Sequence, residues 1–427
     1  MTDTTNQTSR RSFLRNSSAA VVGSSLATLA AQQPVHAASD NVIKVGLIGA
    51  GGRGSGAAVN ASHAGDDVRI TALCDVFPDR LGHAKNLLER RLGEQYAVTD
   101  EQCFSGFDGY KQLLETDVDV VCLCTPPHFR PVQLRAAIEA GKHVFCEKPV
   151  AVDAPGVRSV LETAALAKQK DLSIVSGLCW RYDHGVRATM DKIKNGEIGD
   201  IRTIQENYLT GTLWHRGRKP EWSEMEYQMR NWLYFSWLSG DHIVEQHVHS
   251  LDKAMWLNDD IPPLRCYGLG GRQVRSDEKW GHIYDHFAVC YEWKDGTKCF
   301  SYTRQMKGCY NNVEDYVIGT TGRAEVLRNT VTNSKGDWRY KGDKPSMYDV
   351  EHKELFAGIR AGKHINNGVY MSYSTLLAII GREACYTGKS IGWDEAMASN
   401  TVLGPREYAW GDIEVPEVAV PGKTKFV

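Results

Sequence analysis

Residues 240–252, GDHIVEQHVHSLD, gather three histidines and three carboxylates within thirteen positions. If this segment is helical, His242, Glu245 and His249 share one face, because residues three, four and seven positions apart lie on the same side of a helix. Glu245 could then hydrogen-bond His249 one turn away, which would fix the tautomer of the imidazole and raise its basicity. We therefore favour an acid–base pair in which His249 accepts a hydroxyl proton.

Two other interpretations of the same segment stay open. A mononuclear metal ion needs about three ligands that converge on one point, and His242, Glu245 and His249 could supply them. The segment could also be a structural helix with one polar face. His247 projects from a different face of such a helix and adds an imidazole beside the cluster.

A glycine-rich loop follows the first apolar run of the chain. Residues 49–54, GAGGRG, match the pattern G-x-G-x-x-G between the strand-like run VIKVGLIGA and a helical pattern. In this setting the first glycine permits a tight turn, the second lets backbone amides approach a pyrophosphate, and the third lets helix and strand pack closely. The sequence therefore predicts a dinucleotide site at the amino end of the helix, formed by Gly49, Gly51, Gly52, Arg53 and Gly54.

Asp75 ends the next apolar run, VRITALCD. A carboxylate at this point can accept hydrogen bonds from ribose hydroxyls, and its charge repels a 2′-phosphate. The expected cofactor is therefore NAD, with NADP as the less favoured alternative.

Two further motifs stand at the ends of predicted strands. Thr125-Pro126-Pro127-His128 follows the run VDVVCLC, and Glu147-Lys148 follows KHVFC. Ligands of open α/β sheets bind at the carboxyl ends of strands, so both motifs should face the cofactor cleft. Lys148 could there donate a hydrogen bond to a substrate oxygen and exchange a proton. A surface lysine beside a turn-forming proline is the alternative.

Together these motifs resemble the Gfo/Idh/MocA family of NAD(P)-dependent sugar and inositol oxidoreductases. The resemblance rests on the order GxGxxG, strand-end Asp, TPPH, EKP and G-[GD]-x-[IL]-x-[DE]-x-x-x-H-x-x-D, and it extends over the chain after residue 37. It implies that Lys148, Glu245 and His249 carry the proton chemistry. It also adds Arg181, in CWRY, to the expected cofactor contacts, which otherwise come from Thr125, Pro126, His128 and Glu147.

Two positions depart from the family pattern. Glu245 stands where the family usually has Asp, which preserves the charge with a longer reach. His247 stands where the family usually has Gly, which is expected to place an extra imidazole near the cleft. His247 is therefore a candidate substrate contact.

An aromatic-rich stretch, residues 214–238, precedes the histidine segment and includes Trp214, Arg230 and Trp232. Aromatic faces stack on the C–H faces of sugars, and Arg side chains bind hydroxyls or carboxylates, so we expect these residues to contact the substrate. The alternative is a buried hydrophobic loop.

The elements that position these residues form two regions. In residues 40–178, β-branched runs alternate with helical patterns, which indicates a doubly wound parallel sheet of the α/β class. In residues 179–427, strands follow one another without intervening helices, which indicates an α+β domain with a largely antiparallel open sheet. The expected strands of this domain are 201–209, 264–271, 283–293, 297–305 and 315–320, and the expected late helices are 350–361 and 370–387.

The chain begins with a pattern typical of a twin-arginine signal peptide. Arg10 and Arg11 precede a mildly apolar run, and small residues follow at Ala37 and Ala38. We expect residues 1–37 to direct export of the folded protein to the periplasm. No membrane anchor is expected, because no later run is long and apolar enough to span a bilayer.

Composition narrows the classes of partner. The formal net charge of −2 gives the protein no excess of positive charge, which argues against binding of nucleic acid. The eleven cysteines include no CxxC pair, so most are expected to be thiols in the core. The expected partner is a small-molecule carbohydrate, and the family resemblance implies a dimer or tetramer formed through the open sheet face.

The expected function is a periplasmic NAD-dependent oxidoreductase that transfers hydride between a tightly held cofactor and a sugar, glycoside or cyclitol carbon. One alternative is a glycosidase or lyase that oxidises its substrate transiently, so that the net reaction is redox-neutral. Another is a metal-dependent sugar lyase or hydrolase on the same scaffold. The residues leave the sugar and the net reaction open.

Overall fold

Strand β1 (Ile43–Ile48) lies inside a six-stranded sheet. The computed structural model describes residues 42–426, and the predicted signal peptide, residues 1–37, lies outside the described residues. All neighbours in this sheet pair in parallel, in the order β3-β2-β1-β4-β5-β6. The other strands are β2 (Val68–Asp75), β3 (Cys103–Ser105), β4 (Val120–Leu123), β5 (His143–Cys146) and β6 (Ile174–Ser176).

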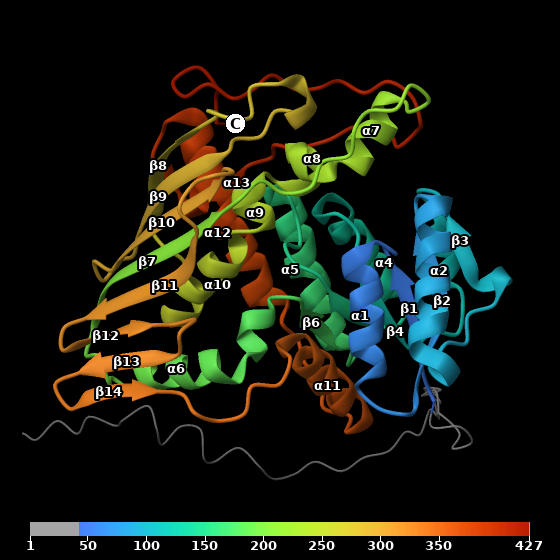
Figure 1. The fold of residues 1–427 in the computed structure, drawn as a ribbon, viewed down its shortest axis with the longest axis horizontal. Helices are drawn as coiled ribbons and strands as arrows, with labels where there is room; N and C mark the ends of the chain where they lie inside the picture. The colour runs from blue at the N-terminus through green and yellow to red at the C-terminus, as the bar shows by residue number, and fades with distance from the viewer. Residues whose placement is uncertain (1–41, 427) are drawn as a thin grey trace, which may run out of the picture. The chain divides into compact units, whose positions relative to one another are not determined.

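Helices connect these strands, as Figure 1 shows. They are α1 (Gly52–Ser62), α2 (Pro78–Leu92), α3 (Gly109–Leu114), α4 (Arg130–Glu139) and α5 (Ala154–Gln169). The predicted doubly wound parallel sheet is confirmed. Its strand order reverses between β1 and β4, which is where such sheets bind ligands. The sequence patterns missed β3 and α3, because elements of three and six residues are too short to show a period.

The second sheet has nine strands, in the order β14-β13-β12-β11-β7-β10-β9-β8-β15. Only β7 and β10 pair in parallel, so the predicted largely antiparallel sheet is confirmed. Its strands are β7 (Ile201–Thr210), β8 (Arg265–Gly271), β9 (His286–Glu292), β10 (Lys298–Gln305), β11 (Asn312–Gly319), β12 (Gly322–Glu325), β13 (Thr330–Asn333), β14 (Gly336–Arg339) and β15 (Ile391–Gly392).

Helices α10 (Val248–Leu257) and α12 (Gly368–Thr387) cover one face of the second sheet (Figure 1). Helix α12 is apolar on nearly every side, because it packs against α5, α10 and β8 at once. The remaining helices are α6 (His184–Lys194), α7 (Glu224–Arg230), α8 (Ser236–Ser239), α9 (His242–Glu245), α11 (Met347–Arg360) and α13 (Trp393–Ala398).

The chain returns to the first sheet late in the sequence. Helix α11 packs on α1, where the Asn60 side-chain amide donates to Asp349 over 2.8 Å. Beyond α11, the Ile174 amide donates to the carbonyl of Ile365 over 2.7 Å. The chain from Val42 onward is one compact unit that contains both sheets. The boundary between residues 178 and 179 stays a prediction.

Two further observations bear on the sequence analysis. No helix among the described residues is long and apolar enough to cross a membrane. All eleven cysteines are free thiols, and most of them are buried, as predicted.

Two glycines of the parallel-sheet region give a matched stability test. A Cβ on Gly54 would lie 1.8 Å from the Gly49 carbonyl oxygen, whereas a Cβ on Gly82, inside α2, would meet nothing within 4 Å. We expect Gly54→Ala to lower the free energy of unfolding by about 1–3 kcal/mol or more through overpacking. Gly82→Ala should raise it by about 0.5–1 kcal/mol through helix propensity. Urea unfolding of both variants measures the difference, and equal midpoints would contradict the close packing of the loop.

Candidate active site

The loop between β1 and α1 has the geometry of a phosphate cradle. Gly49 has a φ of +94°, and a Cβ there would lie 2.6 Å from backbone atoms of Cys124 and Thr125. A Cβ on Gly52 would meet nothing within 4 Å, so this part of the loop faces open space. The first amides of α1, which have no acceptor within their own helix, therefore stand at the edge of that space. The loop fits a dinucleotide pyrophosphate.

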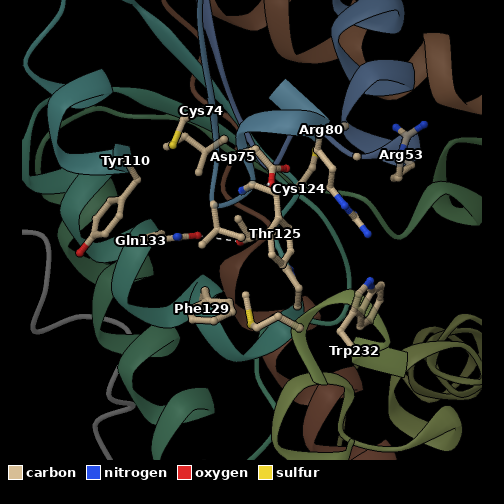
Figure 2. A pocket seen from close by; sticks show the side chains of 18 of the residues that line it. Arg53, Cys74, Asp75, Arg80, Tyr110, Cys124, Thr125, Phe129, Gln133 and Trp232 are labelled. Carbon is tan, nitrogen blue, oxygen red and sulfur yellow. Dashed lines mark hydrogen bonds between the residues drawn. The ribbon is translucent and has the colours of Figure 1, made fainter. Parts of the chain in front are cut away.

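A cavity of about 340 Å³ opens beside this loop (Figure 2). Its walls come from the glycine loop, the ends of β2 and β4, and the segment after β7. Among its lining residues are Gly49, Gly51, Gly52, Arg53, Gly54, Asp75, Thr125 and Pro126, which the sequence assigned to the cofactor. The cavity therefore brings most of the predicted cofactor residues together.

Asp75 closes β2 and faces this cavity. Its carboxylate accepts hydrogen bonds from the backbone amides of Ala50, over 2.8 Å, and Phe77, over 3.0 Å. Burial raises the pKa of Asp75, and these two amides act in the opposite direction. A carboxylate has about four acceptor positions, so two of them stay available for ribose hydroxyls.

The residues of the TPPH motif differ in whether they line the cavity. Thr125 and Pro126 line the cavity, and the Thr125 hydroxyl donates to the Gln133 side chain over 2.6 Å (Figure 2). His128 is not among the lining residues. Its Nε2 lies 2.7 Å from the Tyr408 hydroxyl, and burial lowers its pKa to about 4. The structure thus places His128 behind the cavity wall, and a direct cofactor contact of His128 stays a prediction.

Arg53 links the glycine loop to the EKP turn. Its Nε donates to Glu147 over 2.5 Å, and one Nη approaches Glu351 at 3.5 Å. Burial alone would raise the pKa of the Glu147 carboxyl, but the positive charges of Arg53, Lys148 and Arg130 outweigh it and lower the pKa. Glu147 itself is not a lining residue of the cavity. It fixes the loop helix against the strand end that carries Lys148.

Lys148 and Glu245, the predicted catalytic residues, form an ion pair. The Lys148 ammonium donates to the Glu245 carbonyl oxygen over 2.7 Å and to its carboxylate over 3.2 Å. Both side chains are largely buried, with 15% and 14% of their surface exposed. The end of β5 thus meets the end of α9, although 97 residues separate them in the sequence.

The helix considered for the histidine segment, residues 240–252, is broken. Helix α9 ends at Glu245, and α10 begins at Val248. The Glu245 carboxylate therefore pairs with Lys148, and the expected hydrogen bond to His249 does not form among the described residues. The Nδ1 atom of His249 is buried without a hydrogen-bond partner. Burial lowers the pKa of His249 well below its usual value, and Lys148 and Lys253 lower it further, so its basicity falls rather than rises.

The other two histidines of the segment belong to the protein core. Nε2 of His247 lies 2.5 Å from the Ser301 hydroxyl, and His247 is fully buried. The expected projection of His247 toward the cleft is therefore wrong, because α10 starts a new helical phase. Nδ1 of His242 lies 3.0 Å from the Asp241 carboxylate. No group of three or more His, Cys, Asp or Glu side chains among the described residues could hold a metal ion, so His242, Glu245 and His249 do not form a ligand set.

Arg181 lies in an ion-pair network away from the lining of the cavity. Its guanidinium donates to Asp252 over 3.0 Å and to Asp260 over 2.5 Å, and it stacks on the Tyr370 ring at 3.8 Å. Asp252 also accepts from the Ser374 hydroxyl over 2.8 Å. This network fixes α10 against α12. A cofactor contact of Arg181 stays a prediction.

The aromatic stretch covers the cofactor cavity. Trp214 and Trp232 line the cavity beside the glycine loop, and Arg230 is held by Asp79 and Glu226 at 3.0 and 2.8 Å. These residues were expected around a sugar, and that contact stays a prediction. Four further lining residues were not predicted, although they follow the ends of β2 and β3, where such sheets bind ligands. They are Phe77, Arg80, Phe107 and Tyr110.

Comparison with known proteins agrees with this geometry. Residues 43–176 match the Gfo/Idh/MocA oxidoreductase family, described as having an NAD-binding Rossmann fold. An inositol 2-dehydrogenase of Pseudomonas savastanoi pv. phaseolicola is 26% identical over 364 residues, which are 82% of this chain and 95% of the relative. A glycosyl hydrolase family 109 protein of Shewanella amazonensis is 28% identical over 221 residues, which are 48% of this chain and 47% of the relative.

Solved structures share the fold. The crystal structure of scyllo-inositol dehydrogenase from Lactobacillus casei with bound NAD(H) and scyllo-inositol has a TM-score of 0.63 at 21% identity. The match covers 83% of this chain and 99% of that structure. The match to the Gfo/Idh/MocA oxidoreductases thus lies in the parallel-sheet region, and the solved structures share the fold of the longer chain. The protein is an NAD-dependent oxidoreductase that acts on CH–OH groups, as the sequence predicted.

The buried histidines of the site predict acid sensitivity. His282, whose Nε2 lies 2.6 Å from the Ser236 hydroxyl, has a pKa that burial lowers to about 4. In the unfolded chain the His282 imidazole binds a proton near pH 6.5, whereas in the folded protein it does so only near pH 4. The free energy of unfolding is therefore highest above pH 6.5 and falls as the pH decreases to about 4. The difference between the two pKa values lowers the free energy of unfolding by about 3 kcal/mol at pH 4.

Urea unfolding measured from pH 7.5 down to pH 4.5 tests this expectation. The wild-type free energy of unfolding should fall steadily below pH 6.5, because His247 and His249 also have pKa values well below the usual value. In His282→Gln the free energy of unfolding should fall less steeply as the pH decreases. An identical slope in the variant would show that His282 is protonated in the folded protein.

Proposed function

We propose that the protein is an exported oxidoreductase that removes hydride from a hydroxyl-bearing carbon of a sugar or cyclitol and keeps its NAD bound between turnovers. One observation carries the proposal. Lys148, which follows β5, lies near His249, whose buried Nδ1 has no hydrogen-bond partner, although neither side chain lines the dinucleotide cavity.

The residues supply the proton chemistry. When bound, NAD supplies the position that accepts the hydride. The Lys148 ammonium donates a hydrogen bond to the reacting hydroxyl oxygen, and Glu245 holds that ammonium in place from two directions. His249 is neutral near pH 7, because burial lowers its pKa, and it takes the hydroxyl proton as the carbonyl forms.

A polyol substrate is supported by the relatives. The names of two of them specify inositol 2-dehydrogenase and scyllo-inositol dehydrogenase. The second candidate, a redox-neutral glycosidase, is favoured by the match to a glycosyl hydrolase family 109 protein. In that reaction, transient oxidation would acidify the neighbouring C–H, which would lose its proton as the leaving group departs. Water would then add to the resulting double bond, and bound NAD would supply the hydride acceptor and donor, so that the net change is hydrolysis.

Retention of the cofactor is supported by the C-terminal strap, which we define as residues 403–413. The Leu403 amide donates to Asp153 over 2.9 Å. Trp410 packs on the Phe107 ring at 4.8 Å and on Phe77 at 5.5 Å, and both rings line the cavity. The Gly411 carbonyl accepts from the Met225 amide over 3.0 Å. The strap therefore holds the aromatic wall of the adenosine half in place.

Export and assembly complete the proposal. The twin arginines, Arg10 and Arg11, support translocation of the folded, cofactor-loaded protein to the periplasm. Assembly into a homo-oligomer is supported by the open face of the second sheet, where Leu269, Tyr302 and Ile318 are exposed. Light scattering of the purified protein measures its mass directly.

Cofactor retention has a specific test. We expect the purified wild type to carry nucleotide through extensive dialysis and to release it on denaturation. Trp410→Ala removes the ring behind Phe77 and Phe107, so release should be about tenfold faster or more, since such aromatic contacts contribute about 0.5–1.5 kcal/mol each. Chromatography of the released nucleotide measures retention. Tyr310→Ala, at an aromatic residue with 73% exposure, is the control and should retain it. If wild type and Trp410→Ala retained the same amount of nucleotide, the proposed role of the strap in cofactor retention would be wrong.

The reaction itself is tested by screening sugars and cyclitols for a change in nicotinamide absorbance. Lys148→Ala should lower turnover by about 10²–10⁴-fold while nucleotide stays bound, because the reacting oxygen loses its hydrogen-bond donor. Lys168→Ala, at an exposed lysine of α5, is the matched control. Unchanged turnover in Lys148→Ala, or absence of nucleotide from the wild type, would overturn the proposed function.

A further inference from the structure

We propose that Lys253, a lysine buried between α10 and the second sheet, is a positioning residue for His249: its ammonium fixes the His249 backbone and places a positive charge beside the imidazole. The inference rests on the proposed function, in which His249 takes the hydroxyl proton. It gives a task to a side chain that is 1% exposed, does not line the cofactor cavity and belongs to no motif of the sequence.

A row of polar side chains crosses the inner face of the second sheet. Glu206 on β7 pairs in register with Ser301 on β10 and with Asp315 on β11, so the three side chains stand next to one another on one face. Each of the three residues is at most 1% exposed. Because buried polar groups are costly unless a partner meets them, such a row requires partners from the layer above it.

Helix α10 and the residue before it supply these partners (Figure 1). Nε2 of His247 lies 2.5 Å from the Ser301 hydroxyl. The Lys253 ammonium lies 3.0 Å from the Asp315 carboxylate and donates to the His249 carbonyl oxygen over 2.7 Å. One ammonium thus ties the backbone of His249 to β11.

The charges of this row balance when Glu206 holds a proton. Burial raises the pKa of Glu206 well above its usual value, and the charge of Asp315 raises it further, while Lys253 and the Cys299 thiol of β10 act in the opposite direction. Burial also raises the pKa of Asp315, which the Lys253 ammonium opposes. One protonated carboxyl, one carboxylate and one ammonium carry no net charge, so the core can hold the ammonium at a lower cost.

Stability alone does not account for a lysine at this position. Replacement of a buried ion pair by apolar side chains of similar volume is often neutral or stabilising. Apolar side chains also fit between α10 and its neighbours, because Leu251, Ala254 and Met255 of this helix are fully buried. The residue that the ammonium touches, His249, explains its presence better.

His249 is surrounded by positive charges from three elements. Burial lowers the pKa of its imidazole most, and Lys148 after β5, Lys253 on α10 and Arg53 on α1 lower it further. The Glu245 carboxylate is engaged by Lys148. A neutral imidazole is ready to accept a hydroxyl proton and releases it readily afterwards. The charge of Lys253 therefore acts on the group that transfers the proton, without contact to the substrate.

The protonation of His249 tests this inference without turnover. In protein labelled with ¹³C-histidine, the NMR signal that His249→Gln removes reports the protonated fraction of this imidazole. The double variant Lys253→Met and Asp315→Asn removes the buried ion pair and leaves neither partner behind. We expect it to fold and its His249 to be protonated about threefold to tenfold more at pH 5, because loss of one nearby positive charge raises the pKa by about 0.5–1 unit.

The pH profile of turnover supplies a second readout. In the double variant the acid limb of kcat should move to higher pH by the same amount, whereas KM should stay within about twofold, since Lys253 does not touch the substrate. Lys192→Met is the matched control. Lys192 on α6 also pairs with a carboxylate, that of Glu197 at 3.1 Å, and lies over the Trp338 ring at 4.9 Å. This variant should leave both readouts unchanged.

The other outcomes are equally specific. A folded double variant with the wild-type protonation of His249 would overturn the inference, and so would a loss of turnover that is equal at every pH. A double variant that does not fold would overturn it too, because stability would then account for the lysine. If the wild type turns over no sugar or cyclitol while the protonation of His249 changes as expected, the proposed function fails and the role of Lys253 stands.

Discussion

The ion pair between Lys148 and Glu245 is the contact on which the proposed active site depends. Lys148 follows a strand of the parallel sheet, and Glu245 ends α9, which packs against α12 beside the second sheet. The ammonium binds both the carbonyl and the carboxylate of Glu245, so it fixes a backbone position and a side chain together. Arg53 extends this link, because it ties the glycine loop to Glu147, the residue before Lys148. The glycine loop, Lys148 and Glu245 are thereby held in fixed positions relative to one another.

A single backbone conformation makes this pairing possible. Asp241 has a φ of +71°, which a non-glycine residue adopts at a cost of about 1–3 kcal/mol. Its buried carboxylate accepts from the Tyr284 amide over 2.8 Å and from the Tyr386 hydroxyl over 2.5 Å, which offsets the strain. Helix α9 starts from this residue and ends after four residues. Glu245 therefore faces Lys148, whereas His249 belongs to a new helix.

These contacts explain which parts of the site the sequence predicted. The glycine loop and Asp75 depend on a strand, a turn and a helix that are adjacent in the chain, so a local pattern is enough to find them. The predicted Glu245–His249 hydrogen bond was wrong, because the Glu245 carboxylate pairs with Lys148, which lies 97 residues earlier in the chain. Trp214 and Trp232 were expected to contact a sugar, and that contact stays a prediction. Their position over the cofactor cavity depends on loops after β2 and β3 and on the C-terminal strap, and no local pattern contains that information.

The low pKa of His249 has a consequence for an enzyme that keeps its cofactor. If NAD stays bound between turnovers, as proposed, the group that accepts the proton during oxidation of the hydroxyl also has to donate it when the carbonyl is reduced again. An imidazole whose pKa burial lowers is a weak base but, once protonated, a strong acid. Lys148 adds to this effect, since its positive charge also disfavours the imidazolium. The pairing of Glu245 with Lys148 leaves His249 without a carboxylate partner, and that arrangement suits rapid return of the proton.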